Sequence, residues 1–324
     1  VYVYGREGIV RLHDLNGDGE ADFSESFSDL PIQSTETREF PLDMVARPDG
    51  GFYVAMGGAL NAGPSTSEPI MSGFRAGSRH NGTVMSISPD GESIEVYATG
   101  FRQPYIGLHT PTGTVTASDQ QGNFVPSTPL YVLRKGEFYG VPATAHRRGP
   151  LPEPMPPLTW IPHFSDDSGA GQRFVNSSRM GPLNQRLVHF SYGRPGPYMV
   201  YGDFTAEVPQ GGVVPVPGDF QIPTYKGDVN PKDGQLYMAG FQIYGSRAAT
   251  LKGISRLRYT GAPTTLPADM EAGRQGIVID FNHPLDRKTA LQTANYTVKR
   301  WNYERTEAYG SGHFKLEMRE THQM

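Results

Sequence analysis

The chain has 324 residues, no cysteine and a formal net charge of −4 at pH 7, so it is long enough for one large domain or two moderate ones. The lack of cysteine excludes disulfides, thiolate zinc sites, cysteine nucleophiles and haem attachment through Cys-x-x-Cys-His within these residues. No basic run offers a surface for nucleic acid, and no apolar stretch approaches the ~20 residues that a membrane-spanning helix needs.

An acidic segment, residues 14–25, reads DLNGDGEADFSE and matches the calcium-loop pattern D-x-[DN]-x-[DN]-G-x5-E at every specified position. Ca²⁺ binds about six to eight oxygen ligands, and alternating acidic side chains on a tight loop can supply them. The predicted ligands are Asp14, Asn16, Asp18, Glu20, Asp22 and Glu25. The alternative is a solvated acidic turn that binds no metal.

The residues on either side of this segment, 8–13 and 23–28, alternate in polarity or are β-branched and lack the 3.6-residue period of a helix. They predict a strand, a calcium-binding turn and a second strand rather than an EF-hand. On such a hairpin Asp22 can complete the ligand set while Glu25 points away. Because weak calcium loops are typical of extracellular modules, we expect an exported protein, extracellular or periplasmic.

Short strand-like runs separated by turn residues recur along the chain and predict an all-β fold. They are residues 50–56, 82–87, 93–98, 113–118, 129–133, 197–201, 212–216, 234–239 and 253–258. Units that begin with a turn at Pro48, Pro111 and Pro231 form a weak internal repeat, which is typical of a β-propeller. The Pro-rich stretch 150–162 predicts a long insertion, about 143–172, across one face of that propeller.

The pattern changes near residue 262, which we take as a domain boundary. We assign residues 1–262 to the propeller and residues 263–324 to the start of a small Ig-like β-sandwich, with strands in 276–286 and 294–301. The chain opens on a strand-like sequence and closes without a clear domain end, so we expect a fragment of a longer protein.

Several segments resemble one family. They are TGFRQP at 99–104 with SDQQGN at 118–123, FYG at 138–140 and NPKDGQLY at 230–237. They resemble the large secreted "membrane-bound dehydrogenase domain" proteins of planctomycete and verrucomicrobial type, which are relatives of the glucose and sorbosone dehydrogenases that use pyrroloquinoline quinone (PQQ). Residues 281–286 and 301–303 resemble the segment C-terminal to the propeller in that group, so the resemblance covers nearly the whole chain.

The resemblance implies a six-bladed propeller, with an incomplete N-terminal blade as the alternative, and a quinone bound beside Ca²⁺ at its axial end. In such an enzyme a histidine takes the hydroxyl proton of a sugar or alcohol while hydride passes to the quinone. The implied catalytic residues are His80 and Arg102. The implied cofactor-binding residues are Arg79, Arg102, Gln103, Gly122, Asn123 and Lys226.

The chain also departs from the family pattern, because Gln103 replaces an asparagine and no His-Gly-Gly-Arg-type motif surrounds His80. Whether it is an enzyme therefore stays open. One reading is a PQQ-dependent sugar or alcohol dehydrogenase that passes electrons to a cytochrome c domain of the same protein. Another is a propeller that binds carbohydrate or protein without the cofactor, and a third is a lyase or hydrolase with His80 or His163 as base. Clustering of Arg79, His80, Arg102 and Lys226 at one axial mouth would favour the dehydrogenase.

Overall fold

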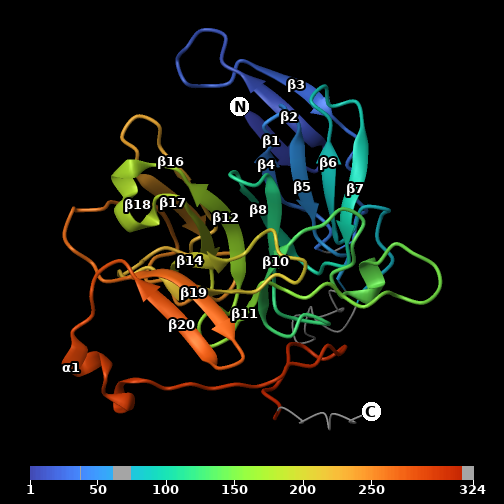
Figure 1. Cartoon of the computed structure of the whole chain (residues 1–324). Helices are drawn as coiled ribbons and strands as arrows, with labels where there is room; N and C mark the ends of the chain where they lie inside the picture. Colours follow the sequence, from blue (N-terminus) through green and yellow to red (C-terminus); the bar gives the residue numbers. More distant parts are fainter. Residues whose placement is uncertain (37, 61–73, 316–324) are drawn as a thin grey trace.

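The computed structural model describes residues 1–36, 38–60 and 74–315, which form an all-β propeller (Figure 1). Five antiparallel sheets are its blades, and each follows consecutive strands of the chain. Blade 1 contains β1 (Tyr2–Gly5), β2 (Gly8–His13) and β3 (Phe23–Ser28). Blade 2 contains β4 (Pro41–Ala46), β5 (Phe52–Met56), β6 (Thr83–Ile87) and β7 (Ile94–Thr99).

Blade 3 contains β8 (Pro104–His109), β9 (Thr114–Asp119), β10 (Thr128–Val132) and β11 (Thr159–Ile161). Blade 4 contains β12 (Gly169–Val175), β13 (Arg186–Ser191), β14 (Gly196–Gly202) and β15 (Gly211–Pro215). Blade 5 contains β16 (Lys226–Val229), β17 (Leu236–Phe241) and β18 (Lys252–Leu257). Three short 3₁₀ helices, η1 (Pro142–Thr144), η2 (Ser178–Leu183) and η3 (Thr293–Asn295), and one helical turn, α1 (Arg287–Ala290), lie in the connections and the C-terminal part.

The internal repeat has a structural cause. Gly50, Gly113 and Gly234 have φ of 94°, 68° and 68° and stand one or two residues before the second strands of blades 2, 3 and 5. A left-handed residue closes the tight turn between the first two strands of each of these blades, and glycine adopts that conformation without a steric cost. In blade 4 the same place is held by Gln185, with φ of 61°, so the repeat is not visible there in the sequence.

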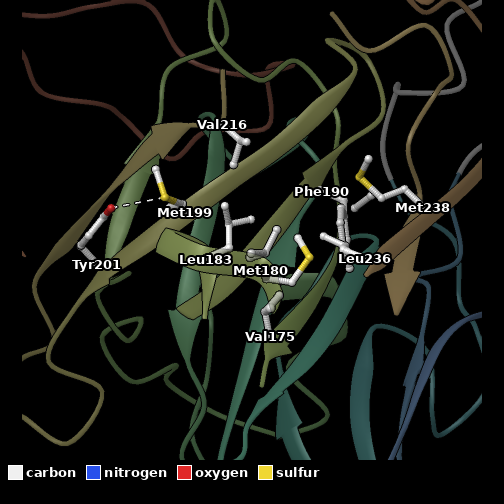
Figure 2. Close-up of a cluster of buried hydrophobic side chains, with 11 residues drawn as sticks. Val175, Met180, Leu183, Phe190, Met199, Tyr201, Val216, Leu236 and Met238 are labelled. Atoms are coloured by element: carbon white, nitrogen blue, oxygen red, sulfur yellow. Dashed lines mark hydrogen bonds between the residues drawn. The ribbon is translucent and has the colours of Figure 1, made fainter. Parts of the chain in front are cut away.

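Four clusters of buried apolar side chains fill the spaces between consecutive blades. Figure 2 shows the cluster between blades 4 and 5, where Phe190 lies beside Leu236 and Met238, and Met199 lies beside Tyr201. These five side chains are at most 1% exposed, and burying each of the four apolar ones contributes about 1.5–3 kcal/mol. None of the four clusters combines residues of blade 5 with residues of blade 1, within the described part of the chain.

The predicted all-β propeller is confirmed, but the predicted number of blades is wrong: the described residues form five blades, not six. Hydrophobic pattern and turn residues indicate strands, whereas the number of blades depends on how the strands are shared among sheets. The predicted insertion at 143–172 contains β11, which is the outer strand of blade 3, and the start of β12.

The predicted C-terminal sandwich does not appear in the described residues. Residues 263–315 form a two-stranded sheet of β19 (Pro267–Gly273) and β20 (Gly276–Phe281), followed by α1 and an extended segment. We call residues 299–315 the tail. In Figure 1 the β19–β20 hairpin (orange) lies beside blade 4, and the tail (red) runs back beneath blade 3.

Candidate functional site

The first strands of blades 2 to 5, β4, β8, β12 and β16, pack in that order around the propeller axis. The loops that lead into them meet at one end, which we call the axial mouth. Its side chains come from segments far apart in the sequence. They are Arg38, Arg102, Gln103, Asp119, Gln120, Ser168, Tyr105, Tyr192, Tyr225 and Tyr244.

Asp119 organises the loop that leads into β8. Its carboxylate accepts the backbone N–H groups of Arg102 (2.8 Å), Gln103 (2.6 Å) and Gln120 (2.8 Å). Burial raises the pKa of Asp119 to about 6, although the three N–H donors favour its ionised form. The carboxylate is therefore occupied in holding the turn, and this places Arg102 at the mouth.

Arg102 is a buried cation, with 4% of its surface exposed. Its Nε has no hydrogen-bond partner among the described residues, and its guanidinium carbon lies 5.5 Å from the ring centroid of Tyr309. Burial is the main cause that lowers the pKa of Arg102. Gly122 makes room for this side chain, because a Cβ at that position would lie 2.1 Å from Arg102 Nε. A desolvated guanidinium with an unused donor is suited to an anionic group.

A second arginine and a group of tyrosines complete the mouth. Arg38 lies with its guanidinium carbon 6.0 Å from the ring centroid of Tyr244, whose hydroxyl contacts Ser168 Oγ at 2.6 Å. The ring of Tyr192 lies 4.5 Å from that of Tyr244 and 4.8 Å from that of Tyr225. Arg38, Tyr225 and Tyr244 are not predicted from the sequence, because nothing in their local sequence marks them and the fold alone brings them together.

Lys226 lies on the axis, on strand β16. Its Nζ forms an ion pair with the buried carboxylate of Asp43 on β4 and donates to the carbonyl oxygen of Met44 at 3.1 Å. Burial raises the pKa of Asp43, and the charge of Lys226 opposes that effect. Lys226 therefore already has an acidic partner in this structure and links the inner strands of blades 2 and 5.

Arg79 and His80 lie elsewhere. His80 is 3% exposed, and its Nδ1 accepts the backbone N–H of Ile32 at 2.9 Å. Burial, followed by the charge of Arg79, lowers the pKa of His80 to about 4, so the imidazole is neutral at pH 7. Arg79 lines a separate pocket of about 460 Å³ that it shares with His146, Arg147 and Arg148. The structure thus brings Arg102, Gln103, Gly122 and Asn123 together but does not place Arg79 and His80 with them.

The tail covers Gly122 and Asn123, the part of the mouth where the resemblance implies that backbone carbonyl groups hold the calcium. The carbonyl oxygen of Gly122 accepts the backbone N–H of Gly310 at 3.1 Å, and Asn123 Nδ2 donates to the carbonyl oxygen of Glu307 at 2.7 Å. The backbone N–H of Phe124 donates to the carbonyl oxygen of Thr306 at 2.7 Å. The buried Arg102 guanidinium therefore lies beside a carbonyl group, that of Gly122, which is already bonded to the tail.

The acidic segment forms the predicted strand–turn–strand arrangement between β2 and β3. Asp14 accepts the N–H groups of Gly17 (2.6 Å) and Gly19 (3.0 Å), and Asp22 accepts the N–H of Leu15 at 2.7 Å. Glu25 points off the strand and contacts His13 Nε2 at 2.7 Å. Within residues 1–36, 38–60 and 74–315, no group of three or more His, Asp or Glu side chains is arranged to hold a metal ion.

The polar residues that follow His163 in the sequence have a structural role. Asp166 is fully buried, and its carboxylate bonds His189 Nε2 at 2.7 Å and Ser191 Oγ at 2.7 Å. Asp167 lies 3.8 Å from Arg194. These contacts hold the loop before β12 against β13.

Solved structures with a similar fold include a glucose dehydrogenase, with a TM-score of 0.50, 14% sequence identity and coverage of 72% of this chain and 68% of that one. The soluble aldose sugar dehydrogenase of Escherichia coli has a TM-score of 0.45 and 16% identity, covering 74% of this chain and 73% of that one. The PQQ-bound aldose sugar dehydrogenase of Streptomyces coelicolor has a TM-score of 0.44 and 14% identity, covering 67% of this chain and 62% of that one.

The aligned part thus spans about two thirds of the length of these proteins, and at such identities the likeness concerns the propeller fold. No family model and no curated protein matches the sequence. No helix among the described residues is long and apolar enough to cross a membrane.

Proposed function

We propose that this chain is the propeller of an exported sugar or alcohol dehydrogenase and that its axial mouth binds an anionic aromatic cofactor, PQQ. The observation that carries the proposal is the buried guanidinium of Arg102, whose Nε lacks a partner among the described residues. PQQ is flat and carries carboxylates, which match the guanidinium groups of Arg102 and Arg38 and the tyrosine rings beside them. The fold shared with a glucose dehydrogenase agrees with this choice.

When bound, PQQ supplies the acceptor for the hydride of the substrate. In this proposal Arg102 and Arg38 neutralise the carboxylates of the ligand, and Asp119 keeps Arg102 in place through the backbone. Tyr244, which is fixed by Ser168, forms a wall that excludes water. His80 is neutral and can accept a proton, but it lies beside the other pocket, so we assign no proton transfer to it at the mouth.

A second candidate function is a propeller that binds carbohydrate without a cofactor. The tail favours this candidate. The backbone N–H of Gly310 already donates to the carbonyl oxygen of Gly122, and the ring of Tyr309 lies against the guanidinium of Arg102. In this candidate the tail, rather than a quinone, is the permanent neighbour of the arginine.

Calorimetric titration of PQQ into the protein separates the two candidates. We expect binding to the wild type and at least tenfold weaker binding to Arg102→Gln, because a charge-assisted contact to a buried cation is worth about 1.5–3 kcal/mol. The matched control is Arg258→Gln, at an exposed position of the same residue type. Thermal unfolding of each variant verifies that it folds.

If PQQ gives no heat with the folded wild type, or binds Arg102→Gln as well as wild type, the cofactor proposal fails and the carbohydrate-binding candidate stands. If PQQ binds, reduction of a redox dye by sugars tests the dehydrogenase activity itself. Transfer of electrons to a cytochrome domain is part of this proposal and is tested by adding a c-type cytochrome in place of the dye.

We further propose that the loop between β2 and β3 binds Ca²⁺ as a structural ion. Asp14, Asn16, Asp18 and Asp22 supply the hard oxygen donors that this ion prefers. Glu25 is left out of this set because it contacts His13. The ion would stabilise the hairpin far from the axial mouth.

A further inference from the structure

A pocket of about 610 Å³ lies between the Pro-rich loop and the tail, on the outer side of blade 3. Its walls are Pro126, residues 153–157, Trp160, residues 299–303 and Arg305. The volume falls within the range of about 300–1,000 Å³ that is usual for small-molecule sites. It shares no lining residue with the pocket beside Arg79, and it contains none of the residues of the axial mouth.

Hydrogen bonds to residues outside the pocket hold its walls in place. Arg305 donates from Nη1 to the carbonyl oxygen of Phe124 at 3.0 Å and from Nη2 to the hydroxyl of Tyr131 at 2.8 Å. The Pro-rich loop is tied down by the backbone N–H of Met155, which donates to the carbonyl oxygen of Phe138 at 2.8 Å. Since each wall is hydrogen-bonded to blade 3 or to the loop beside it, the pocket is preformed, which lowers the entropic cost of binding.

Aromatic rings provide the apolar surface of the pocket. The ring of Tyr303 lies 5.6 Å from that of Trp160 and 6.1 Å from that of Trp301, with interplanar angles of 63° and 85°. The hydroxyl of Tyr303 is buried and has no partner among the described residues. The guanidinium of Arg305 lies over the ring of Trp160 at 5.2 Å, and the ring of His313 is stacked on Trp301 at 4.3 Å. The remaining apolar surfaces of the two tryptophans, together with the prolines, line the pocket and can contact a ligand.

The charge of the pocket is opposite to that of the chain. Lys299, Arg300 and Arg305 line it, and Glu153 is the acidic residue in its described lining, whereas the whole chain has a net charge of −4. Lys299 and Arg300 are exposed and form no ion pair with any residue of the described ranges. Two unpaired cations beside aromatic rings are suited to a ligand with apolar ring faces and negative charge.

We propose that this pocket binds an anionic oligosaccharide, whose sugar rings contact Trp160 and Trp301 and whose carboxylate or sulfate groups contact Lys299 and Arg300. An aromatic side chain contacts the C–H face of a sugar ring, while the cations select the charged sugar over a neutral one. The site is separate from the axial mouth and does not depend on the cofactor proposed there.

The chain contains two tryptophans, Trp160 and Trp301, and both line this pocket. Intrinsic tryptophan fluorescence therefore reports on the site directly. We would titrate the protein with a trigalacturonate, a sulfated oligosaccharide of similar length and a neutral maltotriose, at low salt and at roughly 0.5 M salt, where exposed charges are strongly screened. We expect saturable fluorescence changes with at least one anionic ligand, at least tenfold weaker binding of the neutral one, and a loss of affinity in high salt.

The double variant Lys299→Gln with Arg300→Gln should raise the Kd for the anionic ligand at least tenfold. The matched control is Arg287→Gln with Lys288→Gln, an exposed Arg-Lys pair in α1 that does not line the pocket. The trigalacturonate and the sulfated ligand show which anionic group is preferred. Absence of any saturable signal, equal affinity for maltotriose, or an unchanged Kd in the Lys299 and Arg300 variant would each overturn the proposal.

Discussion

At the scale of single residues, His80 couples the stability of the fold to pH. The pKa of the buried imidazole is about 4, below its ordinary value of 6.5, so between these values the unfolded chain binds more protons than the folded protein. The stabilisation is present above pH 6.5 and is lost as pH falls toward 4. We expect the free energy of unfolding to fall over this range, by at most about 1.4 kcal/mol per pH unit from this residue.

The variant His80→Asn measures this contribution, because Oδ1 of asparagine can accept the Ile32 N–H in place of Nδ1. Urea unfolding between about pH 4 and 8 should give a flatter curve for His80→Asn than for wild type. His283→Asn, at an exposed position, should give the wild-type slope. Equal slopes for wild type and His80→Asn would contradict the assignment of the shift to His80.

Site residues that lie in short, recognisable segments can be predicted from the sequence, whereas residues that reach the site from distant segments cannot. The family resemblance points to Arg102, Gln103 and Gly122 together, and these residues do meet, because Asp119 binds the loop before β8 to the end of β9. Arg38 joins them from a different blade, and its left-handed φ of 68° has no sequence signal. Tyr309 contacts Arg102 because the tail runs back to the mouth, and no repeating pattern in the sequence predicts that path.

At the scale of elements, the β2–β3 hairpin should be stabilised by Ca²⁺. With a Kd near about 1 mM, which is typical of extracellular modules, about 10 mM Ca²⁺ would add about 1.4 kcal/mol to the free energy of unfolding. Thermal unfolding should show a higher Tm with Ca²⁺ than with EDTA in wild type and no difference in Asp14→Ala. Glu25→Gln should keep the response, since Glu25 contacts His13 and not the loop. A wild-type Tm that is the same with Ca²⁺ and with EDTA would refute the prediction that this loop binds calcium.

The tail should depend on Arg305, the side chain that joins it to Phe124 and Tyr131. Arg305→Gln removes two hydrogen bonds of a charged donor, each worth about 1.5–3 kcal/mol. We expect the amides of Phe124, Gly310 and Ser311, which bond across the contact, to exchange hydrogen at least tenfold faster.

Hydrogen exchange with mass spectrometry measures this, and Arg287→Gln on α1 is the control that should leave those amides protected. If the tail competes with a ligand at the mouth, Arg305→Gln should also bind PQQ more tightly than wild type. Unchanged protection of the three amides would show that the tail is held by other contacts.

At the scale of the whole molecule, the all-β class and the propeller are predictable because turns and strands repeat. The number of blades is not predictable from the sequence, because tertiary packing decides which strands pair in each blade. Blade 4 has Gln185 where three others have glycine, and β11 is a three-residue strand inside a Pro-rich stretch. Ile254 on β18 is apolar yet 76% exposed, so hydrophobic pattern alone does not tell whether another sheet covers it.

The contacts of residues 263–315 lead to a prediction about cooperativity. The hydroxyl of Tyr201 on β14 donates to the carbonyl oxygen of Pro267 at 2.6 Å, and the guanidinium of Arg186 donates to that of Ala268, so the β19–β20 hairpin is bonded to blade 4. The tail is bonded to blade 3. An element with such contacts and little core of its own should unfold together with the propeller. We therefore expect a single calorimetric transition for the chain.

Tyr201→Phe should lower that transition by about 1–2 °C, since it removes one hydrogen bond worth about 1 kcal/mol from a single cooperative unit of this size. Tyr296→Phe is the matched control, because its hydroxyl bonds Ala290 within the C-terminal part and does not touch a blade. A separate low-temperature transition, moved by Tyr296→Phe and not by Tyr201→Phe, would instead mean that residues 263–315 fold as an independent unit. A domain boundary near residue 262, as the change in sequence pattern predicts, would then hold despite the hydrogen bonds to blade 4.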